Sequence, residues 1–251
     1  MNGIELNILL PAFIAGLLVL ATHIPLGMKV LARGVIFADL AVAQITGLGV
    51  IIAAMLEITE QPLLVQLIAA ASALCGAGLL AWIETRLADV KEACIGLTFV
   101  LAASGGILLM SHDVHAGEHL KDLLVGQILW VSTPQLIGTA ILTAVLLALW
   151  QWTTLKSHNL GFYGLFALAV TASVQLVGVY LVFASLIVPA LATYRITHRS
   201  MAYAFAIGIA GYAIGLLLSA WFDLPSGATV VWATAILGIL AARLLNPKFA
   251  R

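Results

Sequence analysis

The chain has 251 residues, no formal net charge at pH 7, 63% hydrophobic residues and only 9% charged residues. Soluble domains carry about 25% charged residues, so this composition excludes an ordinary soluble fold, and the balanced charge gives no indication of nucleic-acid binding. Uncharged stretches recur along the whole chain, which predicts a single all-α transmembrane domain over residues 1–251.

The first apolar stretch, residues 8–24, follows a start that lacks the positive charge and small-residue cleavage site of a signal peptide. Glu5 stands where a positive charge would be expected. We therefore expect a retained first helix.

Further apolar stretches are long enough for helices that cross a bilayer, which need about 17–25 residues. They are 36–56, 63–83, 93–110, 135–150, 160–194, 202–221 and 228–244. The stretch 160–194 is too long for one span, and we expect a break near Ser173–Gln175. The sequence thus predicts a polytopic bundle of about eight to nine transmembrane helices, with nine as our count.

Basic residues give the orientation, because short cytoplasmic loops carry an excess of Lys and Arg. Of the eleven basic residues, only Lys121 falls on the opposite side in this arrangement. The others are Lys29, Arg33, Arg86, Lys91, Lys156, Arg195, Arg199, Arg243, Lys248 and Arg251. We expect a multi-pass protein of the inner (plasma) membrane with its N-terminus outside and its C-terminus cytoplasmic.

Asp39 is an acid just inside the second predicted helix, where an ionisable group needs a partner or a water-filled cavity. At about 100° per residue it shares a face with Ala43, while Gln44 lies well round the helix. Asp39 and Gln44 are therefore candidate metal ligands only together with groups from other helices. The alternative is that Asp39 pairs with Arg33 or another basic loop residue.

The external segment 111–124, SHDVHAGEHLKDLL, contains three of the six histidines, His112, His115 and His119. Imidazole and carboxylate groups suit Zn, Mn or Fe, and helical spacing would place the three imidazoles on one face. Two interpretations of this segment stay open: a surface that captures metal ions, or a polar loop that happens to contain histidines. His23, His158 and His198 are assigned no function.

Enzyme signatures are missing from the sequence. It contains no HExxH, GxSxG, Walker or CxxC motif. We therefore expect a transport subunit and not an enzyme, with membrane enzyme as a minor alternative.

Several segments, in the same order, resemble the membrane permeases of ATP-binding-cassette (ABC) importers for zinc, manganese and iron. They are IPLGMKVLARGVIFADLAVAQITGLGV, HLKDLLVGQILWVS, VQLVGVYLVFASLIVPALATYRITH and WFDLPSGATVVWATAILGIL. The resemblance covers nearly the whole chain. It implies a type II ABC importer-like permease fold, a homodimer in the bilayer, a cytoplasmic ABC ATPase subunit and an external solute-binding protein. The divalent metal would be the transported substrate, with no permanently bound cofactor.

Two departures from this family stand out. The family has an Asp and, four residues later, a His on the second helix; Asp39 matches the first, but Ala43 occupies the second position. After Trp152 only TTLKSHNLGFYG separates two spans, where the family has a longer stretch that docks on the ATPase. The leading hypothesis is a metal-importing permease that works by alternating access. The alternative is an ATP-independent channel or carrier, or an accessory membrane subunit.

Overall fold

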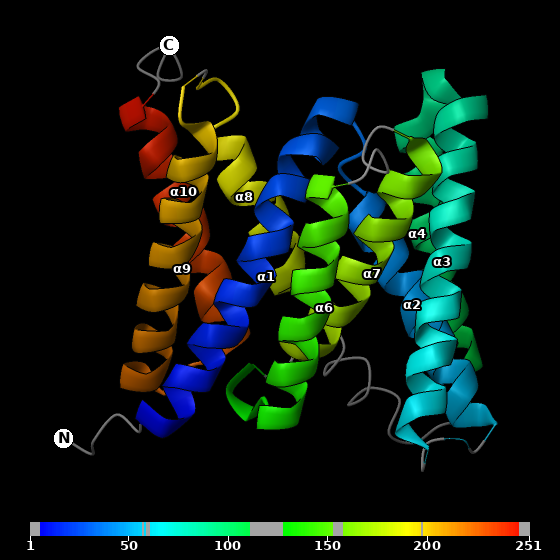
Figure 1. The fold of residues 1–251 in the computed structure, drawn as a ribbon, viewed down its shortest axis with the longest axis horizontal. Coiled ribbons are helices and arrows are strands. Elements are labelled where there is room, and N and C mark those ends of the chain that lie inside the picture. The colour runs from blue at the N-terminus through cyan, green and yellow to red at the C-terminus, as the bar shows by residue number, and fades with distance from the viewer. Residues whose placement is uncertain are drawn as a thin grey trace. The chain divides into compact units, whose positions relative to one another are not determined.

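The computed structural model describes residues 6–56, 58, 61–110, 128–152, 158–196 and 198–245. Nine α-helices and two short 3-10 helices make up this part of the chain, which contains no strand (Figure 1). The α-helices are α1 Leu6–Arg33, α2 Ala38–Met55, α3 Pro62–Arg86, α4 Lys91–Leu109, α6 Thr133–Trp152, α7 Asn159–Val177, α8 Val179–Ala192, α9 Ser200–Phe222 and α10 Ser226–Leu245, and the 3-10 helices are η1 Ala88–Val90 and η2 Ile128–Trp130. The predicted all-α fold is confirmed.

Eight of these helices are long and apolar enough to cross a membrane. The remaining one, α8, has 14 residues, which at 1.5 Å per residue is about 21 Å long and shorter than the hydrocarbon core of about 30 Å. The chain is a polytopic membrane protein, as the sequence predicts.

The long apolar stretch is divided at Gly178 and not near Ser173–Gln175, so the predicted position of the break is wrong. Helix α7 continues through Val177, and α8 begins at Val179. Gly178 has φ 80° and ψ 163°, a combination that is essentially restricted to glycine. The polar residues that suggested the break remain helical, because polar side chains do not by themselves end a membrane helix.

Helix α1 is longer than the predicted span of residues 8–24, because it continues through Pro25 to Arg33. Proline is tolerated in membrane helices when neighbouring groups satisfy the carbonyl that loses its donor. Lys29 and Arg33 therefore lie in the last turns of a helix and not in a loop.

The described helices form two compact units. Unit 1 comprises residues 1–33, 124–144 and 175–251, and unit 2 comprises residues 34–123 and 145–174. The two units alternate along the chain, so neither corresponds to one continuous segment. The single domain over residues 1–251 stays a prediction.

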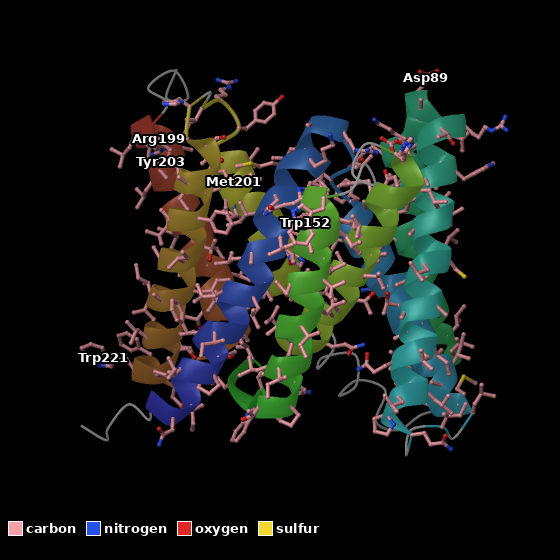
Figure 2. The ribbon with its side chains drawn as sticks, viewed as in Figure 1. Asp89, Trp152, Arg199, Met201, Tyr203 and Trp221 are labelled. Atoms are coloured by element: carbon pink, nitrogen blue, oxygen red, sulfur yellow. The ribbon has the colours of Figure 1, made fainter. Side chains whose placement is uncertain are left out.

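In unit 1, α1 packs against α8 and α9, and α10 packs against the same two helices (Figure 1). Helices α9 and α10 approach closely at Gly215, where a Cβ atom would lie 2.5 Å from Val230 Cα. Figure 2 shows Arg199 and Tyr203 at one end of α9 and Trp221 at the other. Aromatic residues at both ends of a helix are typical of the two membrane–water interfaces.

In unit 2, α2 packs against α3 and α4. On α7, Phe162 stacks on Phe166 with ring centroids 5.8 Å apart and also contacts Trp150 of α6 at 6.4 Å. These rings are part of the buried packing around α7, the helix that also contributes Thr171 to the site described next.

Candidate metal site at the start of α2

Asp39 lies in the first turn of α2 and is fully buried. Neither of its carboxylate oxygens accepts a hydrogen bond from any residue in the described part of the chain. Burying a carboxylate without partners costs several kcal/mol (on the order of 2–7 for a polar group and more for a charge). An acid inside an apolar helix that is buried at such a cost is a candidate functional residue.

The connection before α2 fixes where Asp39 stands. Gly34 has a positive φ of 65°, which lets the chain turn sharply after α1. The backbone N–H of Phe37 donates to Oε1 of Glu92, at 3.1 Å, in the first turn of α4. Glu92 thereby holds the start of α2 two residues before Asp39.

The alternative pairing of Asp39 with Arg33 is not present as a hydrogen bond among the described residues, because both Asp39 oxygens lack a donor. The position of the carboxylate in the first turn of a helix is electrostatically favourable, since the N-terminal end of the helix dipole is positive. The helix therefore compensates part of the cost of burying this acid.

The buried face of α2 continues from Asp39 through Ala43 to Thr46, at spacings of four and seven residues. The Oγ1 atom of Thr46 donates to the Val42 carbonyl at 2.9 Å and lies 3.2 Å from Oγ1 of Thr171 on α7. Hydroxyl groups from two helices thus meet on the Asp39 face.

Sequence reasoning missed Thr46 and Thr171, although the spacing of seven residues from Asp39 to Thr46 was available as a signal. Gln44, the polar substitute proposed from the sequence, is half-buried and lies about 140° round the helix from Asp39. Its role as a ligand stays a prediction.

The three external histidines, His112, His115 and His119, lie outside the described residues. Within the described residues, no group of three or more His, Cys, Asp and Glu side chains is placed to hold a metal ion. Asp39 and the Thr46–Thr171 pair are therefore separate polar positions on one face of α2, about 10 Å apart along the helix at 1.5 Å per residue.

The sequence pattern described as the ABC 3 transport family matches residues 5–159 and 153–244. The chain belongs to the ABC 3 transport family. The two matched segments overlap at residues 153–159, at the connection between α6 and α7.

Relatives in this family have names that refer to metal transport. The chain is 25% identical to the "High-affinity zinc uptake system membrane protein ZnuB" of Haemophilus influenzae, over 94% of this chain and 97% of that protein. It is 27% identical to a "Probable iron transport system membrane protein" of the same organism, over 60% of this chain and 64% of that protein. It is 28% identical to the "Manganese transport system membrane protein MntC" of Halalkalibacterium halodurans, over 63% of this chain and 61% of that protein. The matches thus span less than two thirds of the iron- and manganese-system proteins.

The fold is also similar to a solved structure, "PsaBC from Streptococcus pneumoniae in complex with Fab". The TM-score is 0.68 at 21% sequence identity, over 96% of this chain and 91% of that chain. This similarity confirms the permease-like fold that the resemblance implies.

Proposed function

We propose that this ABC 3 family chain is the membrane-spanning permease of an ABC importer for a divalent metal ion. The observation that carries the proposal is the family match from residue 5 to residue 244, together with relatives named for zinc, iron and manganese transport. The chain would move the ion by alternating access, with the metal as substrate and no permanently bound cofactor. ATP hydrolysis would take place on a separate cytoplasmic subunit.

Asp39 is the proposed transient ligand within the membrane, because its carboxylate is buried and accepts no hydrogen bond from a described residue. Gln44 and the external histidines 112, 115 and 119 remain proposed contributors, the histidines as an external relay.

The test is uptake of radioactive zinc, manganese and iron by cells that lack their own importers for these metals. We expect Asp39→Asn to lower uptake at least about tenfold, because loss of even an outer-shell partner of a metal ligand costs about 10–100-fold in affinity or activity. The matched control is Asp223→Asn, an exposed acid in the left-handed region, which asparagine adopts readily. Full uptake by Asp39→Asn, at equal protein levels, would remove Asp39 from the mechanism.

The proposed partners are a cytoplasmic ABC ATPase, an external solute-binding protein and a second copy of the chain. The connection from α6 to α7 bears on the first of these, because only residues 153–158 separate Trp152 from Asn159. Six residues are too few for a separate docking helix, so another cytoplasmic connection would have to contact the ATPase.

The second candidate function follows from the same short connection: an ATP-independent channel or carrier, or an accessory subunit. Co-purification from native membranes separates the two. An ATPase that co-purifies with the chain and hydrolyses ATP faster in its presence supports the importer function. Metal flux through the purified chain alone, in liposomes without ATP, supports the second candidate.

The proposed orientation, in the inner membrane with the N-terminus outside, is supported by the helix ends. Basic residues lie at the end of α1, α3 and α10 and at the start of α4 and α9, which are the same side of the membrane if successive helices alternate in direction. Cysteines introduced at Asp89 and Asp223, in a chain without Cys75 and Cys94, test this. A membrane-impermeant thiol reagent added to intact spheroplasts should label only the second.

A further inference from the structure

The feature behind this inference is His23, a buried histidine within α1. The sequence places it near the cytoplasmic end of a shorter span, with no role. In the structure α1 continues for ten residues beyond it, to Arg33, and the imidazole is fully buried. It is the one histidine of the chain that falls inside a predicted span.

The contacts of His23 determine which ring nitrogen carries the proton. Nδ1 lies 3.0 Å from the Val19 carbonyl oxygen and 3.0 Å from Oγ1 of Thr22. A carbonyl oxygen only accepts, so this contact requires Nδ1–H to donate. The Thr22 hydroxyl donates to the same carbonyl at 3.1 Å, which leaves its oxygen free to accept from Nδ1.

The other ring nitrogen, Nε2, then presents an unprotonated lone pair in the neutral imidazole. It is buried, and no described residue donates a hydrogen bond to it. A buried acceptor without a donor is costly. Histidines that bind metals have this arrangement: one ring N–H donates to a carbonyl and the other nitrogen faces the ion.

The side of α1 that carries His23 faces α8 and α9. Gly16, His23 and Gly27 lie within about 40° of arc on the helix. A Cβ atom at Gly16 would overlap the ring of Tyr212 on α9, and one at Gly27 would overlap the Leu186 carbonyl oxygen on α8. His23 therefore lies between two close contacts along one interface of unit 1.

The same interface contains further oxygen acceptors. Oγ of Ser185 on α8 donates to the Leu181 carbonyl at 2.7 Å and lies 2.9 Å from the Tyr212 hydroxyl, which therefore donates to it. Pro189 has no N–H, so the Ser185 carbonyl also loses its helical donor. The Ser185 carbonyl is thus an oxygen acceptor in this interface without its helical donor, and a cation can satisfy such an acceptor.

We propose that Nε2 of His23 is an intramembrane ligand for a borderline divalent cation such as Zn²⁺, at the interface of α1 with α8 and α9. The inference rests on the proposed metal transport. Imidazole binds Zn²⁺ and Fe²⁺ more tightly than Mn²⁺. His23 therefore favours transport of Zn²⁺ and Fe²⁺ over Mn²⁺. It supplies an imidazole in a chain that has Ala43 where the family pattern has a histidine.

The first test compares zinc and manganese uptake by the unmodified chain and by variants at His23. We expect His23→Gln and His23→Leu to lower zinc uptake at least about tenfold and manganese uptake less. The control His198→Gln, at an exposed position, should leave both unchanged. Equal zinc and manganese uptake by wild type and both His23 variants overturns the inference. If the wild-type protein takes up none of these metals, the proposed function is refuted instead.

The second test needs no substitution at His23 and so does not depend on how well those variants fold. In a chain whose other five histidines are replaced by Gln, purified with a histidine-free tag, His23 is the sole imidazole. X-ray absorption at the zinc edge of the Zn²⁺-loaded protein should show scattering from one imidazole ring. A spectrum with oxygen ligands alone overturns the inference.

Discussion

Replacement of Gly215 by Ala tests the close approach of α9 and α10. An added Cβ would lie 2.5 Å from Val230 Cα and 3.0 Å from Val230 N, whereas ordinary carbon contacts are about 3.5–4.0 Å. Both obstacles are backbone atoms, so a side-chain rotation cannot relieve the overlap. The helices would have to separate by about 1 Å.

Such overpacking costs about 1–3 kcal/mol, and the better helix propensity of alanine returns about 0.5–1 kcal/mol. We expect a net loss of up to about 2.5 kcal/mol in the free energy of unfolding. The matched control is Gly78→Ala in α3, where nothing lies within 4 Å of the added Cβ, and a gain of about 0.5–1 kcal/mol is expected there.

The assay is reversible unfolding by SDS in mixed lipid–detergent micelles, followed by tryptophan fluorescence. A Gly215→Ala protein as stable as the Gly78→Ala protein would refute the packing of α9 on α10 and the reasoning from it.

Three further predictions concern the backbone and polar contacts. Gly178→Ala should destabilise the protein by about 1–3 kcal/mol, because φ 80° and ψ 163° exclude a side chain; the same unfolding assay, with Gly164→Ala as control, measures this, and an equal effect of both would contradict it. Thr46→Val and Thr171→Val should show a coupling of about 0.6 kcal/mol in a double-mutant cycle, the average for hydrogen bonds between membrane helices, and at most about 1.7 kcal/mol. Independent effects of the two substitutions would show that the hydroxyls do not interact. Glu92→Ala should lower both the unfolding temperature and metal uptake more than Glu92→Gln does, because the glutamine side chain keeps an oxygen that accepts from the Phe37 N–H and alanine has none. Identical behaviour of the two variants would exclude that hydrogen bond as the cause.

The candidate site shows where sequence reasoning reached its limit. Asp39 could be identified because an acid inside an apolar stretch is exceptional whatever surrounds it. Two further features could not be identified from the sequence: that no described residue donates a hydrogen bond to Asp39, and that Thr46 contacts Thr171. Threonines are common in membrane helices, and the partners of any polar group depend on which helices pack together. His23 was passed over for the same reason: a lone histidine becomes informative only when its ring nitrogens are seen.

The sequence by itself determined the membrane class, the all-α fold and the approximate position of eight of the nine described helices. It could do so because hydropathy is a local property, and a bilayer accepts only segments that satisfy their own backbone hydrogen bonds. The tertiary structure decided that the break falls at Gly178 and that α1 continues to Arg33. It also decided that the oxygens of Asp39 and Nε2 of His23 are buried with no hydrogen-bond donor among the described residues. Those features depend on backbone angles and on contacts between distant segments, which no single stretch of sequence contains.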